Sequence, residues 1–120
     1  MARGVSAPRE NQRAYYRVVY PARHRPAATV GGAVTPVLDC SERGVRLRTP
    51  PGEPPVVGDA LALTVRFRGG SEVAIRGTVV RASGGELAVR LEAPGIPMGA
   101  LIAEQRALRA RYPAGWDESQ

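Results

Sequence analysis

The chain has no lysine and very little cysteine, histidine or aromatic side chain. All 17 basic residues among its 120 are arginines, and it holds one cysteine, one histidine, one tryptophan, one phenylalanine and four tyrosines. Without lysine, no lysine nucleophile or Schiff base is available. Cys40 has no second cysteine with which to form an internal disulfide. One cysteine and one histidine, His24, are also too few for a Cys/His zinc site and give little basis for a Cys-His-Asp triad. We therefore expect no enzyme, no metal and no cofactor.

Long apolar runs are absent as well. No stretch approaches the roughly 20 apolar residues that span a bilayer, and residues 1–12 lack the apolar centre of a signal peptide. A chain of 120 residues is the length of one domain. Together with the single cysteine, these features predict a cytoplasmic protein of a reducing compartment, without a membrane span.

The excess positive charge lies near the start of the chain. The formal net charge is +6, and residues 1–35 hold six arginines and one glutamate, while the other 85 residues hold eleven arginines and ten acids. This distribution would concentrate an anionic partner at the N-terminal end.

Short alternating segments separated by turn signals predict an all-β domain. Residues 18–30, interrupted by Pro21, predict an edge strand, because proline cannot donate to a strand ladder. Residues 39–44 are polar and turn-forming, and residues 50–58 hold too many prolines and glycines for a regular element. Further strands are expected at residues 33–38, 45–49, 60–67, 72–81 and 87–91.

The period changes to that of a helix at residues 97–112, where Leu101, Leu108 and Tyr112 share a face and Pro97 suits a first turn. Five or six short antiparallel strands at this length favour a small barrel or sandwich. We expect the helix to cap the barrel or to mediate contacts. The expected organisation is a flexible tail at residues 1–10, one domain at 11–112 and a short tail at 113–120.

Two local patterns are not explained by folding alone. Arg13-x-x-x-Arg17 precedes the first strand, and Asp39-x-Ser41-x-x-Gly44 lies between the second and third, 22 positions after Arg17. As an isolated string, the second pattern is also an ordinary turn in which side chains bond their own backbone. In this order and spacing, the pair resembles the RxxxR and [D/N]xSxxG motifs of the PilZ domain family.

The resemblance covers residues 11–112, since GDALALTVRFRGGSEVAIRGTVVRA at residues 58–82 is similar to the hairpin of that family. It implies a six-stranded antiparallel β-barrel of the PilZ-like, split-barrel type with a C-terminal helix. It also implies binding of the bacterial second messenger cyclic di-GMP. The ligand-binding residues implied by the motifs are Arg13, Arg17, Asp39, Ser41 and Gly44, and position and charge alone add Arg43 and Arg46 as weaker candidates.

These residue types suit cyclic di-GMP, which carries two phosphodiester anions and two guanines. The fork of donors on Arg13 and Arg17 matches phosphate oxygens or the O6/N7 edge of guanine. The carboxylate of Asp39 can accept from guanine N1–H and N2–H₂, and Ser41 can bond a phosphate, a base or the turn backbone. Gly44 permits a positive φ or a close approach at the end of the loop.

We therefore expect a receptor whose arginine-rich N-terminal segment is mobile without ligand and folds over it when bound, which would change a surface for an unidentified protein partner. Two alternatives belong to other classes. A small basic barrel could bind nucleic acid, although this would call for aromatic side chains on a strand face. A PilZ-like adaptor could instead use the helix as a protein-binding surface. The number of bound ligand molecules, one or two, is left open.

Overall fold

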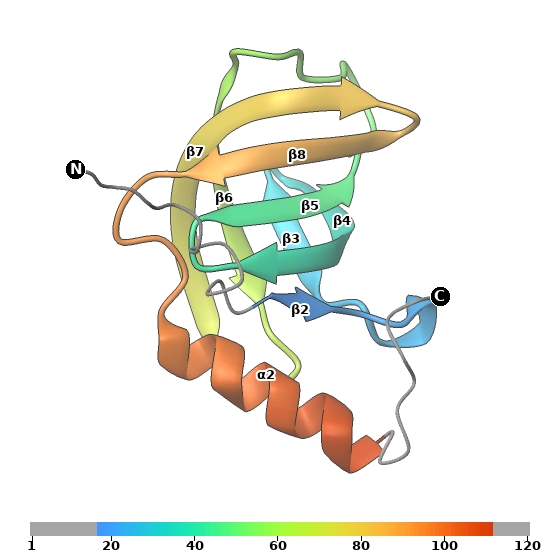
Figure 1. Cartoon of the computed structure of the whole chain (residues 1–120). Coiled ribbons are helices and arrows are strands. Elements are labelled where there is room, and N and C mark those ends of the chain that lie inside the picture. Colours follow the sequence, from blue (N-terminus) through green and yellow to red (C-terminus); the bar gives the residue numbers. More distant parts are fainter. Residues whose placement is uncertain (1–16, 112–120) are drawn as a thin grey trace, which may run out of the picture.

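The structure is a computed structural model that describes residues 17–111. A short strand and a 3₁₀ helix come first, six longer strands follow, and an α-helix closes the order (Figure 1). The elements are β2 (Val18–Val19), η1 (Ala22–His24), β3 (Ala27–Val30), β4 (Ala33–Ser41), β5 (Gly44–Arg48), β6 (Ala60–Arg66), β7 (Glu72–Ser83), β8 (Glu86–Leu91) and α2 (Met98–Arg111).

The strands form a closed antiparallel barrel. Their order is β2-β4-β3-β6-β7-β8-β5, and a further pairing between β4 and β5 joins the two ends, so six strands close and β2 is added outside the ring. The strand β4 makes this possible because its first half pairs with β3 while its second half lies between β2 and β5. The expected six-stranded antiparallel barrel with a C-terminal helix is confirmed.

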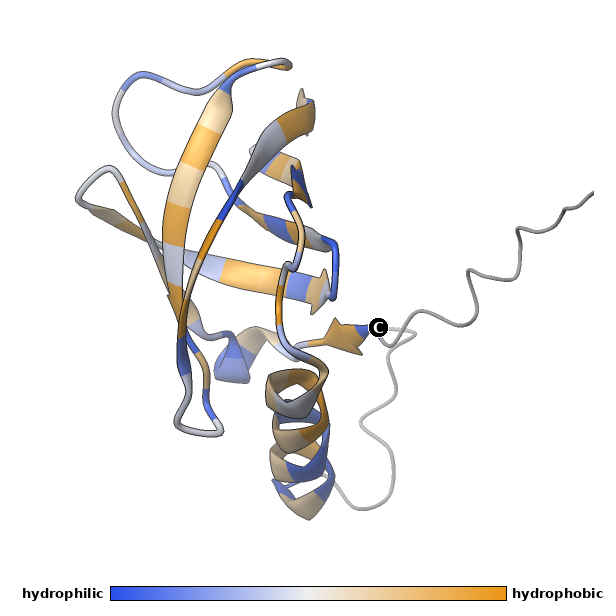
Figure 2. Ribbon diagram, turned by 90° about the vertical axis from the view of Figure 1, so that its left-hand side faces the viewer, coloured by the Kyte–Doolittle hydropathy of each residue, from blue (hydrophilic) through white to orange (hydrophobic). Residues whose placement is uncertain are grey.

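The core is made by the alternating inner faces that the sequence pattern predicted (Figure 2). Leu63 and Val65 on β6, and Ile75 and Val79 on β7, are at most 5% exposed, and they belong to one continuous apolar cluster. Successive side chains of a strand point to opposite faces, so the residues between them lie on the outside of the barrel. The outer face is therefore free to carry polar and charged groups.

The helix α2 lies against β2 at one end of the barrel (Figure 1). Its limits agree with the expected helix at residues 97–112, although Tyr112 lies outside the described residues. Leu101 and Leu108 are buried, as expected, but the fully buried residue between them is Glu104. Within residues 17–111, no helix is long and apolar enough to cross a bilayer.

The expectation of one edge strand at residues 18–30 is wrong. The chain forms two strands there, separated by η1, which begins directly after Pro21. Only β2 is an edge strand, since it pairs with β4 alone, whereas β3 pairs with β4 and β6. Because Pro21 and Pro26 both lie outside the strands, β3 keeps all its backbone donors and can occupy a position inside the sheet.

The expected polar turn at residues 39–44 is shorter than its sequence suggests. The strand β4 continues through Ser41, which pairs with Gly44, so only Glu42 and Arg43 form the turn. Polar residues can continue the strand because alternation directs Asp39 and Ser41 to the outer face and Cys40, 1% exposed, to the core. The expected domain limits at 11 and 112 lie outside the described residues and stay a prediction.

Candidate functional site

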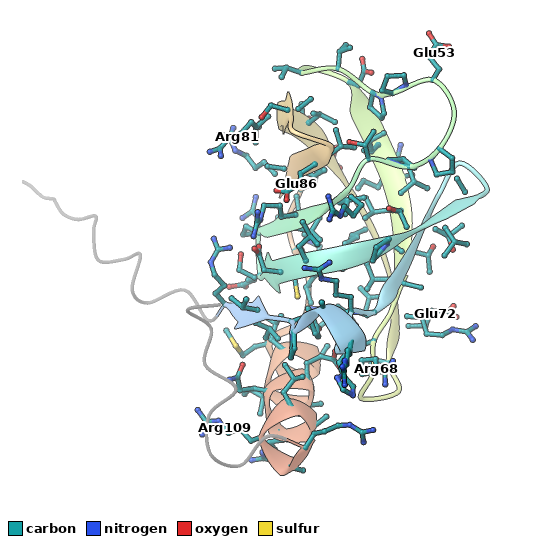
Figure 3. The ribbon with its side chains drawn as sticks, turned by 90° about the vertical axis from the view of Figure 1, so that its right-hand side faces the viewer. Glu53, Arg68, Glu72, Arg81, Glu86 and Arg109 are labelled. Carbon is teal, nitrogen blue, oxygen red and sulfur yellow. The ribbon has the colours of Figure 1, made fainter. Side chains whose placement is uncertain are left out.

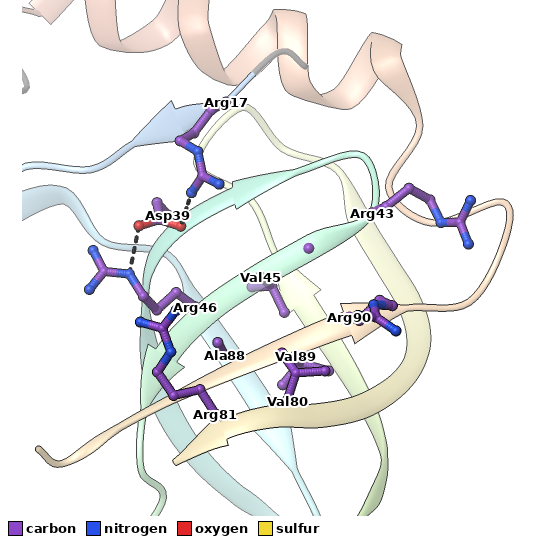
Figure 4. A pocket seen from close by; sticks show the side chains of 11 residues that line it. Arg17, Asp39, Arg43, Val45, Arg46, Val80, Arg81, Ala88, Val89 and Arg90 are labelled. Carbon is purple, nitrogen blue, oxygen red and sulfur yellow. Dashed lines mark hydrogen bonds and ion pairs between the residues drawn. The ribbon is translucent and has the colours of Figure 1, made fainter. Parts of the chain in front are cut away.

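A pocket of about 510 Å³ lies on the outer face of the barrel (Figure 4). It extends from Arg17, next to β2, across β5 and β8 to the far part of β7. Its volume is in the range of small-molecule and cofactor sites. The lining residues are Arg17, Asp39, Arg43, Gly44, Val45, Arg46, Val80, Arg81, Ala88, Val89 and Arg90.

Strand register assembles the pocket from residues that are distant in the sequence. Ala88 on β8 pairs with Arg46 on β5 and with Arg81 on β7, so a small side chain lies between two arginines. The pairing of β7 with β8 shifts between Val79 and Arg81, which is a β-bulge. The bulge places Val80 on the outer face, 42% exposed, beside Arg81. The floor of the pocket is therefore formed by short apolar side chains, while arginines line the rim of the pocket.

Asp39 joins two of these arginines. Its Oδ1 accepts a hydrogen bond from Nη1 of Arg17 at 2.8 Å, and its Oδ2 accepts one from Nε of Arg46, also at 2.8 Å. Asp39 is only 4% exposed. A buried carboxylate requires such partners, and the two guanidinium groups are held in turn. The expected role of Asp39 was to accept from guanine, but in this structure both of its oxygens already accept from arginine.

Arg46 contacts a second carboxylate, that of Glu86, through its Nη1 at 2.7 Å. The hydrogen bond to Asp39, followed by smaller contributions that include Glu86, raises the pKa of Arg46 above its ordinary value. Arg43 is held differently, since its Nε donates to the carbonyl oxygen of Leu91 at 3.0 Å. The guanidinium groups of Arg43 and Arg46 therefore have fixed positions on the rim of the pocket.

Arg81 and Arg90 complete the cationic rim, and sequence reasoning missed both. Among residues 17–111, no carboxylate lies within ion-pair distance of either guanidinium. Figure 4 shows Arg81 extending over the same part of the pocket as Arg46. In the sequence, Arg81 and Arg90 are marked only by their outward positions in alternating strands. Other arginines on the strands have such positions too, so this feature does not single these two out. The pocket thus holds five arginines against one lining carboxylate.

The structure brings together most of the residues singled out from the sequence. Arg17, Asp39 and Gly44 line the pocket, as do both weaker candidates, Arg43 and Arg46. The half-buried Ser41 is not among the lining residues, although it pairs with Gly44 next to them. Arg13 lies outside the described residues, so its part in the site stays a prediction.

Gly44 does not adopt the positive φ that would require glycine. A methyl group added there would meet Ser41 Oγ at 3.5 Å and the carbonyl oxygen of Val89 at 3.8 Å, which are ordinary contacts. Gly44 pairs with Arg90 and shares the outer face of β5 with Arg46. The missing side chain therefore leaves space for a ligand and relieves no backbone strain.

Gly95 holds the turn that carries Arg43. Its φ is +76°, and an added Cβ would collide with the carbonyl oxygen of Glu42. That carbonyl accepts from the N–H of Ile96 at 2.8 Å, and the carbonyl of Arg43 accepts from the N–H of Leu91 at 2.9 Å. The segment before α2 thus fixes the turn between β4 and β5, at the edge of the pocket.

We expect Gly95→Ala to lower the free energy of unfolding by about 2 kcal/mol or more, because strain and a backbone collision add together. Denaturant unfolding measures this loss. The matched control is Gly85→Ala, since Gly85 has a φ of +78° but no heavy atom nearer than 3.8 Å to an added Cβ. Equal losses in the two variants would show that the contact with Glu42 has no part in the effect.

Cys40 lies in the core with its thiol protonated. Burial raises the pKa of the Cys40 thiol to about 12, so the thiol is protonated at neutral pH. It faces the hydroxyl of Tyr20 at 4.0 Å inside the core. Residues 17–111 contain no cluster of His, Cys, Asp or Glu that could hold a metal ion.

The comparisons with known proteins identify the family and the fold. The family model of the PilZ domain matches residues 8–105, and the chain belongs to that family. No curated protein sequence matches the chain.

Solved structures share the fold at low sequence identity. The structure of the Bacillus subtilis inhibitor of motility (MotI/DgrA) has a TM-score of 0.61 and 17% identity, covering 91% of this chain and 57% of that protein. The chain thus spans a little over half the length of MotI/DgrA. An uncharacterised Legionella protein has a TM-score of 0.50 and 13% identity, covering 82% of this chain and 97% of its own.

Proposed function

We propose that this PilZ domain is a receptor for cyclic di-GMP, which binds in the pocket between Arg17 and Arg81. The observation that carries the proposal is the cluster of five arginines around a short apolar floor. Arginine matches phosphate oxygens and the O6/N7 edge of guanine, and its plane can stack on a base. A compact ligand with two phosphates and two purines satisfies these groups together.

The roles within the pocket follow from the contacts. Asp39 orients Arg17 and Arg46, so these two guanidinium groups are positioned before the ligand arrives, which lowers the entropic cost of binding. Arg81 and Arg90, which have no carboxylate nearby within residues 17–111, supply charge to the other side of the pocket. Ala88, which lies between Arg46 and Arg81, leaves room for a flat ring to approach the strand.

Binding is relayed through the segment that leads into β2. Arg17 directly precedes β2. We propose that Arg13 joins Arg17 in the site when this segment closes over the ligand. This closure changes a surface for a protein partner. Family membership supports a ligand-binding or adaptor module, and not an enzyme. An adaptor function is compatible with ligand binding, since α2 lies outside the pocket.

Nucleic acid binding is less well supported. Proteins that bind single strands stack bases on exposed aromatic side chains. The two aromatic residues within the described chain, Tyr20 and Phe67, are both 3% exposed. The arginine-lined pocket therefore suits a compact anionic nucleotide better than a long strand.

Calorimetric titration with cyclic di-GMP tests the proposal through Arg17→Lys. We expect the affinity to fall by about tenfold or more, because lysine keeps the charge but cannot bond Asp39 and a ligand oxygen with one planar fork. Arg76→Lys is the control, since Arg76 is exposed on β7 away from the pocket. An Arg17→Lys variant that binds like the control would contradict this role of Arg17.

A further inference from the structure

A second, smaller cavity lies at the end of the barrel that α2 covers. Its volume is about 120 Å³, and its lining comes from three segments: His24 of η1, Arg68 in the turn between β6 and β7, and Ala107, Leu108 and Arg111 of α2. Figure 3 shows Arg68 beside α2, at the opposite end of the molecule from Arg81 and Glu86. The cavity has room for a few water molecules or one small ion, and not for a dinucleotide.

The cavity is cationic. Arg68 and Arg111 line it, and Arg23 lies close enough to act on His24 electrostatically. Within residues 17–111, no carboxylate is in ion-pair distance of these three arginines. The carboxyl end of a helix carries about half a negative charge, which Arg111 offsets. Arg68 and Arg23 come from other elements, so their charge is not needed for that purpose.

His24 connects the elements around the cavity. Nε of Arg111 donates a hydrogen bond to its Nε2 at 2.8 Å, so the neutral imidazole carries its proton on Nδ1. Desolvation, followed by the charges of Arg111, Arg68 and Arg23, lowers the pKa of His24 below its ordinary value. The charges of the three arginines therefore add to the effect of desolvation, and an anion in the cavity would offset these charges.

We propose that the cavity between His24, Arg68 and Arg111 is a second anion site that binds a phosphate group. The group is supplied as inorganic phosphate or as the phosphate of a nucleoside monophosphate. Guanidinium groups from two separate segments can bond different oxygens of a tetrahedral phosphate, whereas a planar carboxylate offers only two. This site is distinct from the proposed cyclic di-GMP pocket and shares no lining residue with it.

The test uses His24 as a reporter, because it is the only histidine of the chain. Its pKa is measured by NMR in chloride, in inorganic phosphate and in adenosine 5′-monophosphate at equal ionic strength. We expect a saturable rise of the pKa of His24 by about one unit, since a nearby anion stabilises the imidazolium form. A response to inorganic phosphate identifies the free ion as a ligand, and a response to the nucleotide alone identifies the esterified group.

Two variants make the test specific. Arg68→Gln should raise the pKa of His24 in chloride, because a cationic neighbour is removed, and should reduce the further rise in phosphate several-fold. Arg66→Gln is the control, since Arg66 is exposed on the neighbouring strand, 3.4 Å from Glu72, and does not line the cavity. Both residues are exposed, so we expect both variants to fold. The proposal is overturned if chloride and both phosphates give the same pKa, or if Arg68→Gln responds like the wild type.

Discussion

Replacing Asp39 by alanine is expected to weaken cyclic di-GMP binding by about thirtyfold or more, while the fold is kept. The carboxylate is buried and holds Arg17 and Arg46 through one oxygen each, so its removal releases two guanidinium groups at once. The loss corresponds to about 2 kcal/mol, a typical value for charge-assisted hydrogen bonds. The effect on stability should be smaller, because the side chains of Arg17 and Arg46 are 58% and 42% exposed and can be hydrated instead. Calorimetry and denaturant unfolding measure the two effects separately.

A second substitution distinguishes the two possible roles of Asp39. Asp39→Asn keeps one acceptor oxygen and turns the other into an N–H₂ donor that repels a guanidinium, so binding should weaken by an intermediate factor of about ten. A cyclic dinucleotide with hypoxanthine in place of guanine lacks the N2 donor. If Asp39 acts through the arginines, the analogue binds more weakly than cyclic di-GMP by the same factor in the wild type and in Asp39→Asn. If the two ligands bind the variant equally well, Asp39 accepts directly from guanine.

Glu104→Leu is expected to lower the free energy of unfolding by about 3 kcal/mol. Glu104 is 0% exposed, and Oε1 accepts from the hydroxyl of Tyr20 at 2.5 Å while Oε2 accepts from the N–H of Gly69. This one side chain therefore joins α2 to the chain after β2 and to the turn between β6 and β7. Leucine would leave the buried hydroxyl of Tyr20 without this acceptor and would also remove the part-buried hydrogen bond from the N–H of Gly69. Denaturant unfolding gives the magnitude.

Glu104→Gln is the matched variant, and we expect it to cost only about 1 kcal/mol. Its amide oxygen can accept from Gly69, and its amide nitrogen can donate to the hydroxyl of Tyr20, which accepts as well as donates. A leucine variant as stable as the glutamine variant would contradict the idea that Glu104 stabilises the fold by accepting from both Tyr20 and Gly69. Since Tyr20 lies three residues after Arg17, the same contact also anchors the chain segment that enters the pocket.

The fold could be predicted from local patterns because those patterns reflect burial. Alternation placed Leu63 and Val65 in the core, and the change of period located the helix that buries Leu101. The strand arrangement around η1 could not be predicted in this way, since proline signals a break without telling which partner each piece will find. Glu104 was missed for a related reason: a charged residue on a helix is usually solvated, and its two partners are 84 and 35 residues away in the sequence.

The candidate site likewise contains residues that local sequence patterns could predict and residues that they could not. Arg17, Asp39 and Gly44 could be named because they lie in motifs of fixed local spacing. Arg81 and Arg90 could not, because they reach the pocket only through the pairing of β8 with β5 and through the bulge at Val80. Register between distant strands is set by the packing of the whole barrel, and a shift of one residue would turn both arginines to the other face.

The most direct test of the account is NMR mapping of cyclic di-GMP on the wild-type chain. We predict saturable shifts in the backbone amides of Gly44, Arg46 and Ala88, together with Arg17, at micromolar ligand concentrations. The amides of Arg68 and Leu108, at the other end of the barrel, should remain in place. A spectrum unchanged by the ligand, or shifts confined to residues outside the pocket, would contradict the assignment of this pocket as the cyclic di-GMP site.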